Sequence, residues 1–423
     1  MFTNVSTKRS NNAYVIESML EYFIAIAVGA TYLTHVMNYI GIPSSLQGII
    51  NAIISLGCGF QILAILFPLN SNVERKIIIL HTISQILFAF VFFVPLLNFP
   101  FKIKVVALIL SFVPAHIIHN YINSPKISWC MSHVDDSIRG KFTANKEIVS
   151  LLGGMTFSLT LGAIIDKLEV SDKMELAFTI IGGIVIACCL AHTLSLVFVD
   201  KEKTNESKHK VSLKTLFSNK NLMKTLPIFI VWDIAHYITV SFAYAYQSNT
   251  LGFSPLTMTL FTIGGSLLRA LLSRPFGKFA DKYSFAKMLF VCFISHSLGF
   301  AVLTFTVPSI GLVGYILYTV FSYVGSIGIA SSQINLIYDQ VKAEERSSAF
   351  ALSRTFSGFA GFFIVLIISP LYEFIGDNGL ALTPNFTLYP LPAMAMISFT
   401  ITVLLLVYMY FVFFKKKKTT TLK

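Results

Sequence analysis

Apolar runs recur along the chain from near Met19 to near Phe414, and Pro, Gly or charged residues bound each of them. A bilayer core about 30 Å thick needs roughly 20 apolar residues for one helical crossing. The runs therefore predict an all-α membrane protein with twelve transmembrane helices. The predicted helices cover 16–40, 44–68, 77–98, 104–131, 140–165, 174–199, 224–248, 255–276, 284–306, 309–338, 346–372 and 390–414.

Composition points the same way. Only 12% of the 423 residues are charged and 55% are hydrophobic, and the mean hydropathy is +0.73, whereas a soluble domain carries about 25% charged residues. The first apolar run is too long for a signal peptide and begins with Glu17 and Glu21, so it is interpreted as a membrane helix. The five cysteines have no framework spacing and form no ligand cluster with histidines, so we expect no disulfide, metal site or cofactor.

The net charge of +12 reports membrane topology rather than a nucleic-acid partner. Most Lys and Arg residues lie in short segments that alternate with segments poor in them, and in the lysine-rich stretch 200–223. Because basic residues favour the cytoplasmic side, this pattern places both termini in the cytoplasm. We therefore expect a multi-pass protein of the cell (inner) membrane whose surroundings are the lipid bilayer.

The two halves of the chain repeat. A shift of 207 residues without a gap places Pro68 on Pro275, Arg139 on Arg346 and Asp166 on Glu373. This shift predicts two pseudo-symmetric six-helix bundles of parallel orientation, an organisation known among secondary transporters. The predicted domains are an N-terminal bundle (1–199), a basic cytoplasmic linker (200–223) and a C-terminal bundle with a basic tail (224–423).

The segment between the eighth and ninth helices carries a recognisable motif. It runs from Arg274 to Tyr283 and contains Gly277, Asp281 and Lys282, a Gly followed after three residues by an acidic and a basic residue. This motif resembles the signature loop of the major facilitator superfamily. The match is partial, since Ser284 and Phe285 replace an expected Gly and Arg.

Equivalent positions of the first half support the resemblance. Glu74 and Arg75 occupy the acidic and basic positions of the corresponding loop, and the segment at Arg139 is similar to the Arg-Gly turn of the superfamily. The resemblance implies a twelve-helix transporter that works by alternating access. It also implies a cytoplasmic gate in which Asp281 meets the helix that starts near Arg139, and Glu74 the helix that starts at Arg346. The alternative is an ordinary turn with solvated charges.

Four of the predicted helices have a polar face. At 100° per residue, polar side chains gather on one side of the first, fourth, seventh and tenth helices, whereas the third, sixth, ninth and twelfth show no such stripe. Because polar groups are costly in lipid, these faces should point at protein or at water. In the superfamily that the chain resembles, these four helices line the central cavity.

The polar faces supply the candidate substrate-cavity residues, although such side chains also join helices to one another. These candidates are Tyr32, His35, His116, His119, Asn120, Asn123, Asp233, His236, Tyr237, Tyr244, Tyr318 and Ser322.

Ionisable residues among them are candidates for proton coupling. Asp233 lies deep in a predicted span and His236 is one turn away, so we expect this pair to be the principal site. Glu21 with His35 is the second candidate. Arg269 and Arg354 also lie within predicted spans. They are equally compatible with holding an anionic substrate and with pairing to acids such as Glu147 or Asp233.

The leading functional hypothesis is proton-coupled transport of a small organic solute by a monomeric carrier. A proton-driven drug or metabolite exporter is an alternative, but Ser150–Asp166 lacks the proline of the Gly-Pro-Gly signature that such antiporters carry in their fifth helix. A sensor that binds without transport is a second alternative. A membrane-embedded enzyme is a third, and the sequence contains no HExxH, GxSxG or phosphate-loop motif for it.

Overall fold

The chain is an all-α membrane protein with the predicted spans. The computed structural model describes residues 5–69, 72–134, 139–201, 213–342, 345–384 and 386–414. Within them, 11 helical segments are long and apolar enough to cross a membrane. The remaining predicted span, α6 (Val73–Phe90), is shorter and begins with the charged residues Glu74, Arg75 and Lys76.

The helices form two compact units. Unit 1 comprises residues 1–208 and 244–260, and unit 2 comprises residues 209–243 and 261–423. The first break falls near the linker that the sequence indicates. The segment 244–260 groups with unit 1, where the Asn249 side chain hydrogen bonds to those of Asn38 and Ser44.

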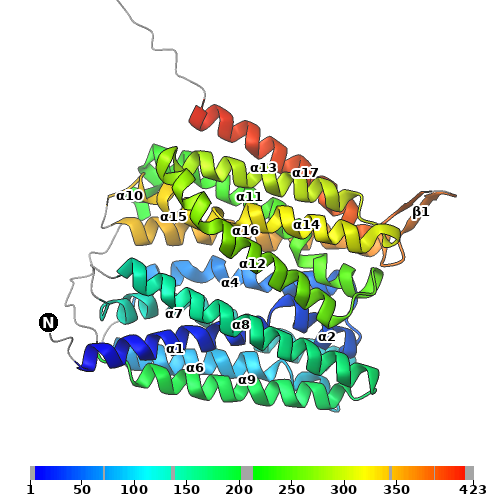
Figure 1. Cartoon of the computed structure of the whole chain (residues 1–423), viewed down its shortest axis with the longest axis horizontal. Helices are drawn as coiled ribbons and strands as arrows, with labels where there is room; N and C mark the ends of the chain where they lie inside the picture. Colours follow the sequence, from blue (N-terminus) through cyan, green and yellow to red (C-terminus); the bar gives the residue numbers. More distant parts are fainter. Residues whose placement is uncertain are drawn as a thin grey trace, which may run out of the picture. The chain divides into compact units, whose positions relative to one another are not determined.

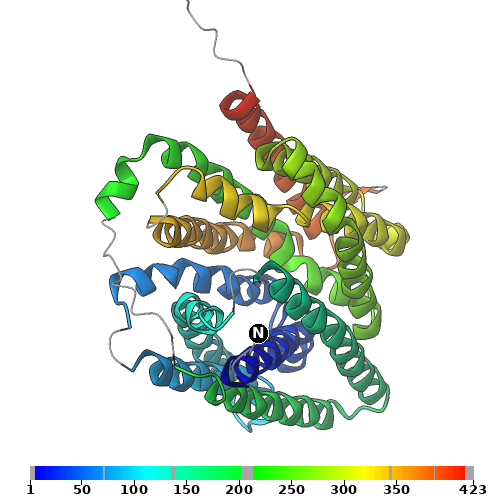
Figure 2. The ribbon, with the colours of Figure 1, turned by 60° about the vertical axis from the view of Figure 1, so that its left-hand side comes forward.

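Unit 1 contains the first six spans (Figure 1). Its elements are α1 (Val5–Ala27), α2 (Ala30–Ile40), α3 (Ser44–Asn51), α4 (Ile53–Gly59), η1 (Phe60–Ile62), α5 (Leu63–Leu66), α6, η2 (Val94–Leu96), α7 (Phe101–Met131), α8 (Arg139–Val170) and α9 (Met174–Val197). Helix α1 packs against α8 and α9, and α6 packs against α7 and α9 (Figure 2). These contacts bring α1, α6, α7 and α9 together around one interior.

The first predicted helix is broken in two. The chain leaves the helical path at Val28 and Gly29, between α1 and α2. A Cβ atom at Gly29 would lie 3.0 Å from the carbonyl oxygen of Ile26, so the turn has little room for a side chain. The break separates the N-terminal part of the predicted polar face, which contains Glu21, from the C-terminal part, which contains His35.

The second half of the chain contains the other six spans. Its elements are α10 (Leu213–Ser218), α11 (Lys220–Ala245), η4 (Tyr246–Thr250), α12 (Pro255–Lys282), α13 (Phe285–Thr304), η5 (Pro308–Ile310), α14 (Gly311–Ser326), α15 (Ile329–Tyr338), α16 (Arg346–Ile375), β1 (Leu380–Thr383), β2 (Phe386–Leu388), α17 (Pro390–Met409) and η7 (Tyr410–Phe414). In unit 2, α13 packs against α14 and α17, and α16 packs against α15 and α17. The antiparallel pair β1–β2 was not expected from the sequence.

Helix α12 extends further than the sequence suggests. The predicted helix ends at residue 276, but α12 continues through Pro275 to Lys282. Gly277, Asp281 and Lys282 therefore lie on a helix rather than in a loop. Ser284 then begins the next helix, because its hydroxyl oxygen accepts a 3.2 Å hydrogen bond from the Lys287 backbone N–H as an N-cap.

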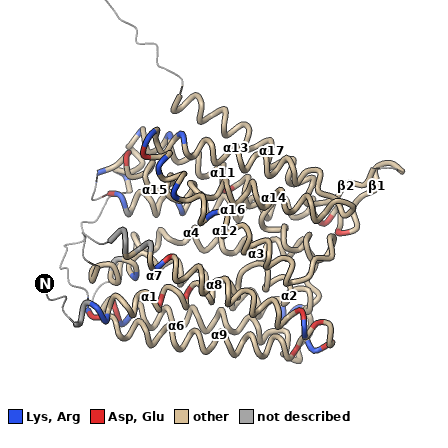
Figure 3. The backbone as a smooth tube through the Cα atoms, in the orientation of Figure 1, with Lys and Arg blue, Asp and Glu red and all other residues tan. Residues whose placement is uncertain are grey.

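Charged residues concentrate at the ends of the helices in each unit, and the intervening lengths carry few of them (Figure 3). This distribution follows from the cost of charge in hydrocarbon. The few charges that lie within the spans are therefore the first place to look for function.

Candidate functional site

Among the described Asp, Glu, Lys and Arg residues, three have buried side chains: Glu17, Lys126 and Asp233. A buried charge within a membrane span is costly unless it has a partner or a role. Glu17 and Lys126 belong to unit 1, and Asp233 belongs to unit 2.

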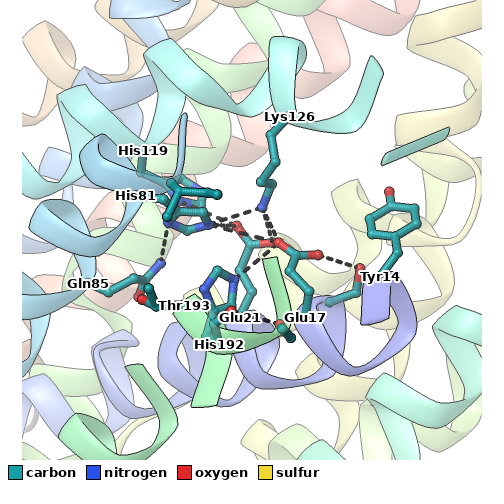
Figure 4. Close-up of polar contacts among 12 residues, drawn as sticks. Tyr14, Glu17, Glu21, His81, Gln85, His119, Lys126, His192 and Thr193 are labelled. Carbon is teal, nitrogen blue, oxygen red and sulfur yellow. Dashed lines mark hydrogen bonds and ion pairs between the residues drawn. The ribbon is translucent and has the colours of Figure 1, made fainter. Parts of the chain in front are cut away.

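Glu17 and Lys126 are parts of a compact polar cluster (Figure 4). The ammonium of Lys126 on α7 donates hydrogen bonds to Oε1 of Glu17 at 2.7 Å and to Oε2 of Glu21 at 2.5 Å, both on α1. Glu17 and Glu21 are four residues apart, so consecutive turns of α1 present them to the same neighbour. Glu17 and Lys126 are almost fully enclosed, whereas the Glu21 side chain is 21% exposed.

Three histidines surround the carboxylates. Nε2 of His192 on α9 donates to Oε1 of Glu17 at 3.1 Å. Nε2 of His81 on α6 and Nδ1 of His119 on α7 lie 3.5 Å and 3.6 Å from Oε1 of Glu21. We call these six residues the Glu–Lys–His cluster: Glu17, Glu21, His81, His119, Lys126 and His192.

Of these six residues, only Glu21 and His119 were among the candidates that the sequence indicates. His81 and His192 come from the third and sixth spans, for which no polar stripe was found. Gln85 lies one turn from His81, and its amide is 3.1 Å from Nδ1 of that ring, which turns Nε2 toward Glu21. Lys126, which lies within the predicted span 104–131 and five residues before its end, was the available signal for the position of the cluster.

The charges of the cluster do not balance. With neutral histidines, the two carboxylates and the one ammonium leave one net negative charge in an enclosed interior. Such an excess is unfavourable at low dielectric. One added proton would neutralise it, and the three imidazoles and two carboxylates offer places for that proton.

Two facing atoms of the cluster are positioned to share an added proton. Oε1 of Glu21 and Nδ1 of His119 lie 3.6 Å apart, and neither has a hydrogen-bond partner among the described residues. A proton on either atom would allow a hydrogen bond between them. The corresponding atoms of Glu17 are already engaged, because Oε1 accepts from Lys126 and His192 and Oε2 accepts from Ser18 at 3.0 Å.

The cluster also contains a set of possible metal ligands. Ligand atoms of Glu17, Glu21, His81 and His192 lie within 4.8 Å of one another. Two imidazoles and two carboxylates are a donor set that zinc accepts. The Lys126 ammonium, however, already supplies a positive charge at hydrogen-bond distance from both carboxylates. A metal ion would have to displace it.

The other unit 1 candidates lie outside the cluster. Tyr32 is buried, and its hydroxyl donates to the Ser158 carbonyl at 2.6 Å. His35 is buried, and its Nε2 has no hydrogen-bond partner among the described residues, whereas the imidazole near Glu21 is that of His119. His116 packs between the rings of Phe88 and Phe112.

Asn120 and Asn123 continue the same face of α7. The Asn120 amide donates to the His116 carbonyl at 2.9 Å and accepts from Gln61 at 3.2 Å. Asn123 is half-buried. These positions are compatible with the cavity that the polar face predicts. They are equally compatible with a structural role, in which the asparagine side chains hydrogen bond between helices.

In unit 2, Asp233 is paired with arginine rather than with histidine. Its Oδ2 lies 3.9 Å from Nη1 of Arg354 on α16, one of the two partners considered from the sequence. The His236 ring instead stacks on Trp232 at 5.3 Å.

The remaining candidates of the second half of the chain are half-buried. They are Tyr237, Tyr318 and Ser322 in unit 2, and Tyr244, which groups with unit 1. The Tyr318 ring packs edge-on against Tyr315 at 5.6 Å.

The residues of the expected gate lie at helix ends. Gly277, Asp281 and Lys282 are exposed in the last turns of α12. Arg346 begins α16 and lies over the Tyr338 ring at 5.4 Å. Glu74 and Arg75 begin α6. Arg139 begins α8, but its side chain is outside the described part of the chain.

A family model described as Major Facilitator Superfamily matches residues 13–365. The chain belongs to the major facilitator superfamily. This family consists of membrane transporters, so the chain carries a transporter fold and the Glu–Lys–His cluster lies in the N-terminal half of such a transporter. A search of curated proteins finds no match.

Solved structures of superfamily transporters share this fold at low identity. A variant of the nucleoside transporter NupG has a TM-score of 0.71 at 13% identity, covering 96% of this chain and 100% of that one. A D-xylose–proton symporter has a TM-score of 0.68 at 14%, covering 95% and 97%. The xylose transporter XylE from E. coli has a TM-score of 0.70 at 11%, covering 99% and 100%. Such identities carry the fold and not the substrate.

Proposed function

We propose that this superfamily member carries a small organic solute across the cell (inner) membrane by alternating access, coupled to protons. The observation that supports coupling is the charge imbalance of the Glu–Lys–His cluster, two carboxylates against one ammonium inside the membrane-spanning part of unit 1. A site that lacks one positive charge in low dielectric has a physical reason to take up a proton.

The proton is shared between Glu21 and His119. These are the more accessible members of the cluster, with side chains 21% and 26% exposed, and their facing atoms have no hydrogen-bond partner among the described residues. The groups that act on this proton are Glu17 from α1, His81 from α6, Lys126 from α7 and His192 from α9. Glu17 stays ionised because Lys126 and His192 donate to it.

Coupling requires the proton to bind differently in the two access states. The cluster joins four helices of one unit, so a change in their packing changes the distances between its charges. Protonation therefore biases the packing of α1, α6, α7 and α9. A D-xylose–proton symporter has the same fold, so this architecture is compatible with proton coupling.

The test uses purified protein in proteoliposomes that contain a pH-sensitive dye. A panel of sugars, nucleosides, amino acids and carboxylates is added outside, and solute-dependent proton entry identifies a substrate. Proton exit would instead favour the exporter alternative. Binding without proton or solute movement would favour a sensor, and chemical conversion of a solute would favour an enzyme.

The variant Glu21→Gln tests the site. We expect it to exchange labelled solute across the membrane at equilibrium but to lose accumulation driven by a pH gradient. Glu169→Gln is the matched control, because Glu169 is an exposed acid on α8 of the same unit. Accumulation by Glu21→Gln with the wild-type pH dependence would contradict the proposal.

A further inference from the structure

The pair Asp233–Arg354 is the second place where charges lie inside the spans. Asp233, on α11, is the one buried side chain among the Asp, Glu, Lys and Arg residues that the described part of unit 2 contains. Its carboxylate lies 3.9 Å from the Arg354 guanidinium, at the limit of an ion pair. In unit 1 the corresponding distances are 2.7 Å and 2.5 Å. The ion pair in unit 2 is therefore longer than the two ion pairs in unit 1.

The two partners differ in access. The Arg354 side chain is 26% exposed and that of Asp233 is 11% exposed. Arginine presents a planar fork of N–H donors that matches a carboxylate in a bidentate arrangement. At 3.9 Å, the separation between Nη1 of Arg354 and Oδ2 of Asp233 is longer than a charge-assisted hydrogen bond of about 2.7–2.9 Å.

Aromatic side chains pack beside the α11 segment that carries Asp233, and Ser357 on α16 also acts on the Asp233 carboxylate through a hydrogen bond. Trp232 precedes Asp233 on α11 and stacks on Phe293 of α13 at 4.7 Å. The titratable groups on the packed elements are His236 on α11 and, across the Trp232 ring, His296 on α13, 6.3 Å from His236 between ring centres. Within this described environment Arg354 is the one permanently cationic group.

We propose that Arg354 binds the carboxylate of an organic anion, which replaces Asp233 as its partner. This inference names the substrate class of the transporter proposed above, and it rests on that function only in that the bound anion is the transported solute. A carboxylate that meets Arg354 leaves Asp233 without its counter-charge. Asp233 then takes up a proton from water, which adds one proton to that held in unit 1.

Charge conservation is the physical reason for this exchange. The ionised pair is neutral, and a bound carboxylate with a protonated Asp233 is neutral as well. Binding of the anion alone would leave a net negative charge in low dielectric. Arg354 and Asp233 together therefore favour an anion that arrives with a proton and disfavour an amine or an uncharged solute.

Thermal unfolding of the purified full-length protein in detergent tests this without a pH gradient. The probes are lactate, benzoate and succinate, each compared with its uncharged amide. We expect at least one carboxylate to raise the unfolding temperature in a concentration-dependent way and its amide to have no effect. Arg354→Gln should abolish the shift, and Arg354→Lys, which keeps the charge without the fork, should weaken binding about tenfold.

In contrast to the Arg354 variants, Asp233→Asn should strengthen carboxylate binding. Because it removes the internal competitor for Arg354, it should tighten carboxylate binding roughly tenfold near neutral pH and make binding nearly independent of pH. Arg269→Gln is the matched control, since Arg269 is an exposed arginine on α12.

The proposal is wrong if no carboxylate stabilises the protein, if the amides act equally, or if Arg354→Gln binds as well as the wild type. Arg354→Lys and Asp233→Asn keep the test informative if Arg354→Gln does not fold. Carboxylate binding without proton uptake in liposomes would contradict only the proposed coupling. Proton uptake driven by an uncharged solute would contradict only the carboxylate assignment.

Discussion

Lys126 donates a 2.7 Å hydrogen bond to Glu17 while both side chains are enclosed within membrane-spanning helices of unit 1. A lysine can neutralise only one carboxylate, and the same ammonium also contacts Glu21. The pair thus fixes α7 to α1 and at the same time leaves the second carboxylate in need of a proton or another cation.

Removal of Lys126 should destabilise the protein. Lys126→Met leaves two carboxylates uncompensated in the interior, and breaking a buried ion pair costs about 3–5 kcal/mol. Thermal or denaturant unfolding in detergent measures this loss. Lys167→Met is the control, because Lys167 is an exposed lysine on α8 and its loss should change stability by less than about 1 kcal/mol. Equal effects of both substitutions would contradict a role for the buried pair.

A second prediction follows from the net charge. Glu17→Gln leaves Glu21 and Lys126 as a neutral pair, so accumulation driven by a pH gradient should be lost although Glu21 is intact. The double variant Glu17→Gln/Lys126→Met restores one net negative charge and should recover part of the pH dependence. Solute uptake at several external pH values measures both. Uptake by Glu17→Gln with a normal pH profile would show that the charge of the cluster does not set coupling.

The pattern of apolar runs was sufficient to predict the spans and, with the motif around Asp281, the family. The cluster could be predicted only in part. Glu17, Glu21 and His119 lie on the polar faces of their helices, but His81 and His192 come from helices that are apolar over most of their length. A few polar residues within one or two turns of such a helix form no stripe along its length, so the direction in which they point depends on packing that the sequence does not specify.

Local breaks limited the prediction in the same way. Glu21 and His35 share a face on an uninterrupted helix, but the turn at Gly29 separates α1 from α2 and ends that alignment. Conversely, the predicted eighth helix ends at residue 276, one residue after Pro275, whereas α12 continues to Lys282. Whether a glycine or proline ends a helix depends on tertiary contacts as well as on the residue itself.

Asp233 provides a third prediction. Asp233→Asn leaves Arg354 without its carboxylate and removes the group proposed to take up a proton in unit 2. Accumulation of substrate against its gradient should fall at least tenfold, and equilibrium exchange should persist. His236→Gln is the comparison, because the His236 ring stacks on Trp232 and not on Asp233. An equal loss in both variants would return the coupling role to the Asp233–His236 pair that the sequence suggested.

The last prediction concerns the expected cytoplasmic gate, and the position of Asp281 on α12 makes this prediction more specific. Asp281 is exposed in the last turn of α12, where the negative end of the helix dipole disfavours a carboxylate. Glu74 lies in the first turn of α6, where its own helix already favours it. A contact with the N-terminus of another helix would therefore stabilise the carboxylate of Asp281 more than that of Glu74. The superfamily resemblance implies that this helix is α8, which starts at Arg139. A charge-assisted hydrogen bond of about 1.5–3 kcal/mol shifts a two-state balance tenfold or more.

Asp281→Asn should accordingly favour the inward-open state. Cysteines introduced on the cytoplasmic side of α7 and α11 would then react faster with a membrane-impermeant thiol reagent applied from that side, in a background without the five native cysteines. Asp339→Asn is the control, because Asp339 directly follows α15 outside the signature motif. Since the proposed contact exists only while the cytoplasmic side is closed, its loss should leave the reactivity of cysteines on the opposite side unchanged or lower. Equal labelling in Asp281→Asn and the wild type would show that the end of α12 is only a solvated helix terminus.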